Sequence, residues 1–205
     1  ATNDLSFLCI QASMHTQLPA PSFSVRIWNG TPNEFLIKCA ELTRTGVGLP
    51  AYYNDEVIIP ALMSRGVTLA DAREYGIIGC VEPQKPFKTD GWHDAAFFNM
   101  CRPLELVFSN GVDKGAQISI KTGNVEDMTT FEEFYNAYKA QETYMIGLMV
   151  NAINAIDTAH SERVPLPFLS CMVEDCVKEG KTVQEGGAHY NFTGPQGFGI
   201  ASGYL

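Results

Sequence analysis

The sequence predicts an α/β fold in which short strands alternate with helices. Strand-like runs such as residues 22–28 are followed by signals for a helix start, as at residues 31–34, and this alternation favours parallel strands. Of the 205 residues, 45% are hydrophobic and 18% are charged, which is the composition of a globular protein with a buried core. No composition break, repeat or linker divides the chain, so residues 1–205 are expected to form one domain or part of one.

The first expected strand and helix lie before residue 47. Residues 22–28 alternate polar and apolar side chains as a half-buried strand does, and Asn29-Gly30 then marks a turn. Thr31-Pro32-Asn33-Glu34 resembles a capping box with proline in the first turn, and Gly46 is a suitable end for the helix. The apolar face of that helix should consist of Phe35, Cys39 and Leu42.

The next two elements lead toward the segment that carries the candidate chemistry. The apolar run Val57-Ile58-Ile59 predicts a short buried strand. Thr68 is suited to cap a helix that continues to about Tyr75. Gly76-Ile77-Ile78 then runs directly into Gly79-Cys80.

Two helices are expected in the middle of the chain. The first should run from about His93 to Asn110, with Gly111 at its end. A capping box, Thr130-Phe131-Glu132-Glu133, predicts the start of a second, long helix. The apolar stripe of the long helix is interpreted as core rather than as a cofactor pocket, and it consists of Phe131, Phe134, Tyr138, Met145, Met149, Ala152 and Ile156.

The last part of the chain is expected to contain one more helix and then irregular structure. Pro165 and Pro167 break the chain before a helix from about Phe168 to Glu179, which Gly180 should end. From Gly186 onward the chain is rich in glycine and turn signals and has little periodicity, so no element is predicted there.

The charge balance excludes several classes of partner. With 14 basic and 23 acidic residues the net charge is −9, which would repel nucleic acid and anionic membrane surfaces and favours a small neutral or metabolite substrate. No run reaches the roughly 18 apolar residues of a membrane span. Residues 1–13 lack a positively charged region before their short apolar run. We therefore expect a soluble, cytoplasmic protein.

The cysteines do not form a recognisable metal site. The six lie at positions 9, 39, 80, 101, 171 and 176, without a Cys-x-x-Cys pair or a Cys/His cluster. An even number would allow disulfides, but a chain of this size without a signal peptide is expected to keep its thiols reduced in the cytoplasm. The sequence therefore predicts no metal and leaves Cys80 free to react.

Cys80 and Glu82 form a candidate pair of reactive side chains. Pro83 disfavours a helical Glu82, so the stretch should be extended or turn-like, and residues two apart in an extended chain point to one side. A thiol and a carboxylate would then face the same small ligand. The alternative is a loop cysteine beside a surface glutamate, which the sequence physics alone favours. A cysteine protease is a weaker hypothesis, because no His or Asn partner is identifiable.

Several motifs, in order along the chain, carry a family resemblance. Gly79-Cys80-Val81-Glu82-Pro83 resembles the cysteine loop of glycyl radical enzymes, in the branch of dehydratases and lyases that includes the B12-independent glycerol and propane-1,2-diol dehydratases. The related formate acetyltransferases carry two adjacent cysteines here, whereas Cys80 stands alone, which argues against acyl transfer from pyruvate; a formate acetyltransferase-like enzyme stays an alternative. The supporting stretches are residues 17–26, 54–60, 91–99, 104–106 and 190–197.

The resemblance implies a fold and a chemistry. The fold would be part of a ten-stranded α/β barrel with the cysteine on a loop inside it. A glycyl radical on a second loop, installed by an S-adenosylmethionine-dependent iron–sulfur activase, would convert Cys80 to a thiyl radical. The thiyl would remove a hydrogen atom from a substrate carbon and Glu82 would deprotonate the hydroxyl on that carbon. The family also implies a homodimer, an activase as partner and no cofactor bound by this chain.

The resemblance also implies a substrate class. Asp94 matches the aspartate with which glycerol and propane-1,2-diol dehydratases hold the substrate hydroxyls, and His93 beside it is a second candidate contact. The structural alternative for Asp94 is an acidic residue that stabilises the first turn of the predicted helix, and His93 could simply bond within the barrel wall. Other leaving groups stay open, as in isethionate sulfite-lyase, choline trimethylamine-lyase or hydroxyproline dehydratase, and so does a non-enzymatic fragment.

One family motif is missing from the chain. Family enzymes are several times longer, and the Arg-Val-x-Gly-Tyr motif of the glycyl radical loop has no match, since Ser202-Gly203-Tyr204 shares only Gly-Tyr with it. We therefore expect an internal fragment or one piece of a split enzyme, inactive by itself and unstable or associated when isolated. The complete enzyme would be cytoplasmic or enclosed in a bacterial microcompartment.

Overall fold

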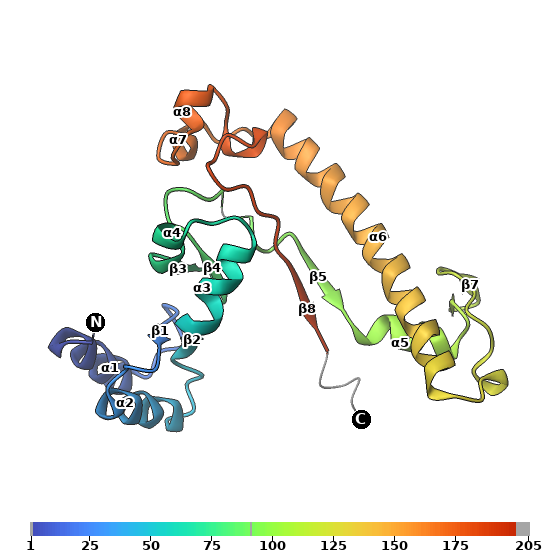
Figure 1. The fold of residues 1–205 in the computed structure, drawn as a ribbon, viewed down its shortest axis with the longest axis horizontal. Coiled ribbons are helices and arrows are strands. Elements are labelled where there is room, and N and C mark those ends of the chain that lie inside the picture. Colours follow the sequence, from blue (N-terminus) through green and yellow to red (C-terminus); the bar gives the residue numbers. More distant parts are fainter. Residues whose placement is uncertain (1, 91, 200–205) are drawn as a thin grey trace. The chain divides into compact units, whose positions relative to one another are not determined.

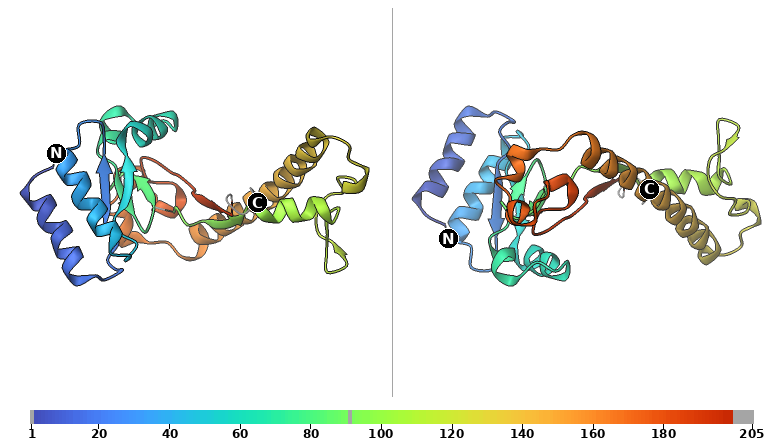
Figure 2. Two further views of the ribbon diagram at one scale, coloured as in Figure 1. Left: turned by 90° about the horizontal axis from the view of Figure 1, so that it is seen from below. Right: turned by 90° about the horizontal axis from the view of Figure 1, so that it is seen from above.

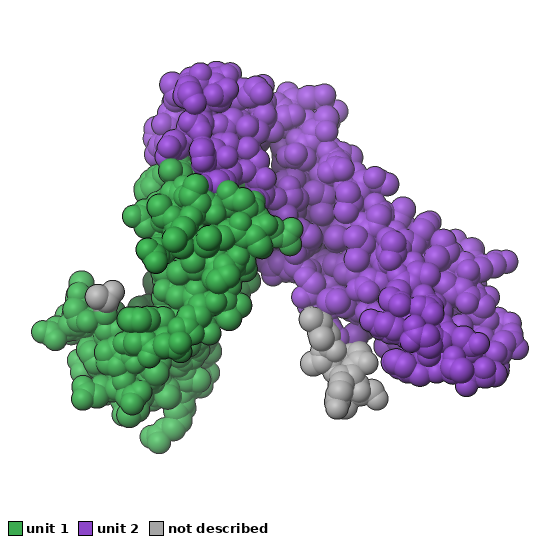
Figure 3. All heavy atoms as spheres, viewed as in Figure 1, with its two compact units in different colours: residues 1–91 green, residues 92–205 purple. Residues whose placement is uncertain are grey.

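The chain divides into two compact units, residues 1–91 and residues 92–205 (Figure 3). The computed structural model describes residues 2–90 and 92–199. Both units mix helices with short strands, as the α/β prediction requires, and each contains one parallel pair of strands (Figures 1 and 2). The assignment of residues 1–205 to a single barrel segment stays a prediction.

The first unit is built on two parallel strands. β1 (Ser24–Ile27) pairs with β2 (Ala51–Asn54) in a register that places Arg26 opposite Tyr53. Helices α1 (Asp4–Thr16) and α2 (Asn33–Arg44) pack beside them. The predicted strand and helix are confirmed, and so is the apolar face of α2. The core of this region consists of Ile10, Val25, Phe35, Cys39 and Leu42.

The start of α2 differs from its prediction. Thr31 does not cap the helix, because its hydroxyl accepts a hydrogen bond from the backbone N–H of Trp28 at 2.9 Å. The residue at the cap position is Pro32, which makes no side-chain cap bond. The predicted end is correct, since the helix stops at Arg44 and Gly46 follows with a φ of +83°.

The predicted strand at Val57-Ile58-Ile59 is wrong. These residues lie in α3 (Asp55–Ser64), where Val57 is 63% exposed. Asn54 ends β2 and caps this helix by accepting a hydrogen bond from the N–H of Glu56 at 3.0 Å. A short apolar run cannot be assigned to helix or strand by periodicity alone, and here the cap before it decides.

A capped short helix and a hairpin complete the first unit. Thr68 caps α4 (Leu69–Arg73), as predicted, by accepting a hydrogen bond from the N–H of Asp71 at 3.2 Å. The chain then forms β3 (Gly76–Ile78), a three-residue turn and β4 (Glu82–Gln84). The two strands are antiparallel, and the pair Ile78 and Glu82 closes the turn.

The second unit contains the other parallel pair. β5 (Ala96–Asn99) pairs with β8 (Pro195–Phe198), and the two strands lie side by side in Figure 1. The predicted helix from His93 is therefore wrong in its first half, which contains two adjacent phenylalanines that favour a strand. The helix that forms is α5 (Cys101–Phe108). β8 lies in the region where no element was predicted.

Gly111 has the role expected of it at the end of α5. Its N–H donates to the carbonyl of Leu106 at 2.8 Å, and that of Asn110 donates to the carbonyl of Val107 at 3.2 Å. Asn110 has a φ of +50°, so the pair forms a Schellman motif. The chain continues through β6 (Val112–Asp113), β7 (Ala116–Gln117) and the 3-10 helix η1 (Val125–Asp127).

The long helix α6 (Phe131–Arg163) begins with the predicted capping box, in which Thr130 and Glu133 bond each other's backbone N–H groups. The prediction that its stripe is core is wrong for several members. Phe131 is 76% exposed, and the buried residues of α6 are Ala137, Gln141 and Ile153.

The chain after α6 forms a small cluster of short elements. The helix expected over residues 168–179 is two helices, α7 (Pro167–Ser170) and α8 (Cys176–Glu179), and Gly180 ends the second with a φ of +65°. The 3-10 helix η2 (Val183–Glu185) follows. The buried residues of this cluster are Val173, Cys176, Val183 and Ala188.

Candidate active site

Cys80 lies in the turn of the β3–β4 hairpin, with its thiol exposed. Gly79, before it, has a φ of +58°, a backbone conformation that favours glycine. A Cβ at position 79 would also lie 2.8 Å from Oε2 of Glu82. The backbone angle therefore favours glycine at position 79, and Cys80, the next residue of the turn, is exposed.

Glu82 is the first residue of β4 and is 8% exposed. Its Oε2 accepts a hydrogen bond from the backbone N–H of Val81 at 2.8 Å. The stretch from Cys80 to Glu82 was predicted to be extended or turn-like, and it is turn-like. The extended conformation, in which successive side chains point to opposite sides, begins at Glu82. The hairpin thus carries an exposed cysteine in its turn and a buried carboxylate that bonds the backbone of that turn.

Tyr53, on β2, contacts the same turn. The phenol is 7% exposed, and its hydroxyl donates a hydrogen bond to the carbonyl oxygen of Cys80 at 3.0 Å. Burial raises the pKa of Tyr53, so the hydroxyl stays a donor at neutral pH. No signal in the sequence linked this residue to Cys80, because the contact joins residues 27 positions apart.

Arg26, Asp55 and Tyr75 form a polar cluster at the base of the hairpin. The guanidinium of Arg26 bonds both carboxylate oxygens of Asp55, at 2.8 and 2.9 Å, and its centre lies 3.9 Å from the centroid of the Tyr75 ring. The Tyr75 hydroxyl donates to Asp55 at 2.7 Å. Burial alone would raise the pKa of Asp55, but the bonds from Arg26 and Tyr75 outweigh it and lower that pKa.

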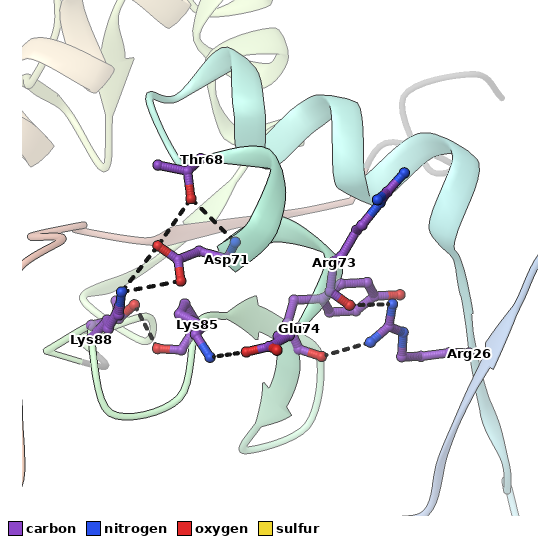
Figure 4. Close-up of polar contacts among 9 residues, drawn as sticks. Arg26, Thr68, Asp71, Arg73, Glu74, Lys85 and Lys88 are labelled. Atoms are coloured by element: carbon purple, nitrogen blue, oxygen red, sulfur yellow. Dashed lines mark hydrogen bonds and ion pairs between the residues drawn. The ribbon is translucent and has the colours of Figure 1, made fainter. Parts of the chain in front are cut away.

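Further contacts fix the chain on both sides of the hairpin (Figure 4). Arg26 donates to the carbonyl of Arg73 at 3.0 Å, just before β3. After β4, Lys85 pairs with Glu74 at 2.7 Å. Lys88 pairs with Asp71 at 3.2 Å. The chain that leads into the hairpin is therefore tied to Arg26 of β1, and the chain that leaves it is tied to α4 and to the residue that follows α4.

His93 and Asp94, the other two candidates, lie in the second unit, in the irregular segment before β5. Asp94 is exposed and accepts a hydrogen bond from the side-chain amide of Gln196 on β8. The interpretation of Asp94 as a helix-stabilising residue is wrong, because no helix begins there. Gln196 lies in residues 190–197, one of the stretches that carry the family resemblance. Its contact with Asp94 could not be predicted, because it depends on the β5–β8 pairing.

The backbone beside His93 makes a close approach to the chain before β8. The N–H of Gly194 donates to the carbonyl of Trp92 at 3.1 Å, and that of Ala95 donates to the carbonyl of Gly194 at 3.3 Å. A Cβ on Gly194 would lie 2.9 Å from the Cα of His93. Glycine is required here to let the two segments meet, and their meeting sets the position of His93 and Asp94.

The side chains that commonly bind metal ions lie apart in the described part of the chain. Over residues 2–90 and 92–199, no three His, Cys, Asp or Glu side chains are grouped as metal ligands would be. The same residues include no helix with the length and apolarity needed to cross a bilayer. All six cysteines are free thiols. The Gly-Tyr pair of residues 203–204 and Gly91 of the motif before Trp92 lie outside the described residues.

Two solved structures are similar to this chain in both fold and sequence. The chain is 68% identical, with a TM-score of 0.91, to a structure from a study of 1,2-propanediol dehydration in Roseburia inulinivorans. It is 63% identical, with the same TM-score, to the glycerol-bound B12-independent glycerol dehydratase of Clostridium butyricum. In each case 98% of this chain is matched, against 25% and 26% of the relative. The α/β barrel prediction is confirmed at the level of this shared fold.

A sequence relative of known activity agrees with the structural matches. The (2S)-3-sulfopropanediol dehydratase of Klebsiella oxytoca is 39% identical over 204 residues, which are 98% of this chain and 25% of that protein. The chain thus spans about a quarter of the length of the relatives that it matches. The family model described as pyruvate formate lyase-like matches residues 1–203. The chain therefore belongs to the pyruvate formate lyase-like family, as its cysteine-loop motif had predicted.

Proposed function

We propose that this chain is the cysteine-loop part of a glycyl radical dehydratase that converts a small diol, glycerol or propane-1,2-diol, to an aldehyde. One observation carries the proposal. Cys80 and Glu82 share one tightly held hairpin in a chain that is 63% and 68% identical to structures connected with those two diols. The lower identity of 39% to a sulfopropanediol dehydratase favours the unsubstituted diols.

The exposed thiol of Cys80 suits a residue that exchanges a hydrogen atom with two partners. The glycyl radical of the complete enzyme, supplied by another segment, would take the thiol hydrogen and leave a thiyl radical. Cys80 would then take the hydrogen atom from the carbinol carbon of the substrate. Once the second hydroxyl has left, Cys80 would return a hydrogen atom to the product radical and regain its thiyl form.

Glu82 would handle the proton of the same carbinol centre. Its carboxylate would take the hydroxyl proton as the substrate radical forms, and the electron pair so released would expel the neighbouring hydroxyl group. The leaving hydroxyl would depart as water with the proton that Glu82 took up, which restores the Glu82 carboxylate, so the atoms balance as diol to aldehyde plus water. Asp94 and His93 are proposed as contacts for the substrate hydroxyls, with Gln196 holding Asp94.

The proposal extends to the complete protein and its partners. Large apolar side chains are exposed, among them Phe87 at 74%, Phe97 at 68% and Phe168 at 80%, which suits a piece that other barrel segments cover. We propose a radical S-adenosylmethionine activase as partner, a homodimer as the assembled enzyme and a cytoplasmic or microcompartment location. Nucleic acid and membranes are not proposed as partners of so acidic a chain.

The test uses the full-length activated protein with Cys80→Ser as the diagnostic variant. We expect the variant to form the glycyl radical, detected by electron paramagnetic resonance, and to lose dehydration of both diols. Dehydration retained by the variant would refute the role of Cys80. Wild-type turnover of isethionate, choline or trans-4-hydroxy-L-proline in place of the diols would overturn the substrate class, and no radical at all would favour a non-enzymatic protein.

A further inference from the structure

The peptide unit that joins Cys80 to Val81 is held at both of its polar ends. Its carbonyl oxygen accepts a 3.0 Å hydrogen bond from the hydroxyl of Tyr53. Its N–H donates a 2.8 Å hydrogen bond to Oε2 of Glu82. Two bonds on opposite ends of one peptide fix the orientation of its plane, which in turn fixes the ψ angle of Cys80.

The two bonds come from different places. Glu82 is the second residue after Cys80, so its bond is internal to the hairpin. Tyr53 lies on β2, which pairs with β1, and the residue is 7% exposed. Its hydroxyl is therefore held in place by structure outside the hairpin. The turn itself begins with a glycine at a φ of +58°, and glycine gives the backbone little resistance to rotation. The Tyr53 bond therefore supplies a restraint that the turn lacks.

We propose that Tyr53 is a positioning residue that orients Cys80 for hydrogen-atom transfer. The inference rests on the proposed function, in which the sulfur of Cys80 must meet first a radical donor and then a substrate carbon. Hydrogen-atom transfer needs the sulfur close to the atom that gives or receives the hydrogen. A misplacement of the sulfur by about 1 Å would cost on the order of 100-fold in rate. Tyr53 acts on this step through the Cys80 backbone, whose carbonyl oxygen its hydroxyl holds.

The experiment compares Tyr53→Phe with a matched control on the same strand, in the full-length activated protein. Tyr52→Phe is the control, because the Tyr52 hydroxyl bonds the hydroxyl of Thr43 on α2 at 2.8 Å, and the residue is 43% exposed. Both changes remove a single hydroxyl from β2. Rates are expressed per glycyl radical counted by electron paramagnetic resonance, so a partly unfolded sample does not distort the comparison.

We expect Tyr53→Phe to lower kcat by about tenfold, the factor that corresponds to the loss of about one hydrogen bond, with KM unchanged. The deuterium isotope effect with propane-1,2-diol labelled at C1 should rise, because hydrogen abstraction becomes more rate-limiting. A general loss of stability would change neither quantity once the rates are normalised. Tyr52→Phe should match the wild type in kcat and in the isotope effect.

The outcomes separate this inference from the proposed function. If Cys80→Ser is inactive and Tyr53→Phe behaves like Tyr52→Phe, the positioning role is wrong and the function stands. If Tyr53→Phe raises KM and leaves kcat and the isotope effect alone, Tyr53 acts on substrate binding instead. If Cys80→Ser keeps its activity, the proposed function fails first and the role of Tyr53 fails with it.

Discussion

The carboxylate of Glu82 accepts a hydrogen bond from the backbone N–H of Val81, so the proposed base is also a structural part of the turn that presents the proposed radical residue. This double use has a consequence for mutagenesis. Removal of the side chain would loosen the turn as well as remove the base. A variant that keeps the hydrogen bond and loses only the ability to take a proton is needed to separate the two roles.

Glu82→Gln meets this requirement, because the amide oxygen of glutamine can still accept from Val81. We expect kcat of the activated full-length protein to fall by at least about 100-fold, the usual contribution of a general base, while the glycyl radical forms to the wild-type level. Steady-state kinetics and electron paramagnetic resonance measure the two quantities. Glu41→Gln, an exposed partner of Lys38 on α2, is the control and should stay within about twofold of the wild type.

A small effect of Glu82→Gln would show that the carboxylate serves the turn alone. Loss of the radical signal together with activity would point the same way, since it would mean that the variant had damaged the cysteine loop rather than the proton transfer. The expected pattern is a normal radical with slow turnover.

The sequence predicted most of the elements whose signals are local. The caps at Thr68 and Thr130, and the buried face of α2, depend on residues within one or two turns of each other, and all are confirmed. The errors arise where a local pattern has two solutions. The apolar run at residues 57–59 fits a helix or a strand, and the cap at Asn54 decided between them.

The residues of the candidate site were proposed from the sequence, but the contacts around them were not predictable from it. The cysteine-loop motif named Cys80 and Glu82 by resemblance. Two contacts of the site could not be predicted, that of Tyr53 with the Cys80 carbonyl and that of Gln196 with Asp94. They depend on strand pairings between segments far apart in the chain, for example β5 with β8. Such pairings leave no periodic trace in a single sequence, and the four residues of β8 show no alternation that would mark a strand.

The Arg26–Asp55 pair should make the first unit sensitive to acid. The folded protein lowers the pKa of Asp55 from its ordinary value of 3.8, so the contribution of the pair is present at neutral pH and is lost as the pH falls through the lowered folded pKa. We expect Asp55→Asn to destabilise the full-length protein by about 2 kcal/mol at pH 7, the worth of a charge-assisted hydrogen bond. The difference from the wild type should shrink between pH 5 and pH 3.

Thermal unfolding of both proteins across this pH range measures the difference. Glu41→Gln is the control, because Glu41 pairs with Lys38 on the exposed face of α2 at 2.7 Å and such surface pairs contribute under about 1 kcal/mol. A difference for Asp55→Asn that stays constant down to pH 3 would contradict the assignment of the effect to a carboxylate with a lowered pKa.

Gly194 should be needed for the position of His93 and Asp94. A Cβ at residue 194 would lie 2.9 Å from both the Cα and the carbonyl oxygen of His93, and backbone atoms cannot yield as a flexible side chain can. Gly194→Ala should therefore push the two segments apart and destabilise the protein by about 1–3 kcal/mol, the usual cost of overpacking. If Asp94 holds the substrate hydroxyls, KM for the diol should rise as well.

Gly147→Ala is the matched control, because Gly147 lies within α6 and its would-be Cβ would meet no atom within 4 Å beyond the neighbouring backbone of that helix. An alanine there favours the helix, by up to about 1 kcal/mol, so this variant should be as stable as the wild type or more so, with KM unchanged. Equal stability and equal KM for the two alanine variants would mean that the approach of residue 194 to His93 does not set the position of Asp94. Asp94→Asn leaves the backbone contact of residue 194 intact. If this variant raises KM as Gly194→Ala does, but without loss of stability, the binding effect belongs to the Asp94 carboxylate.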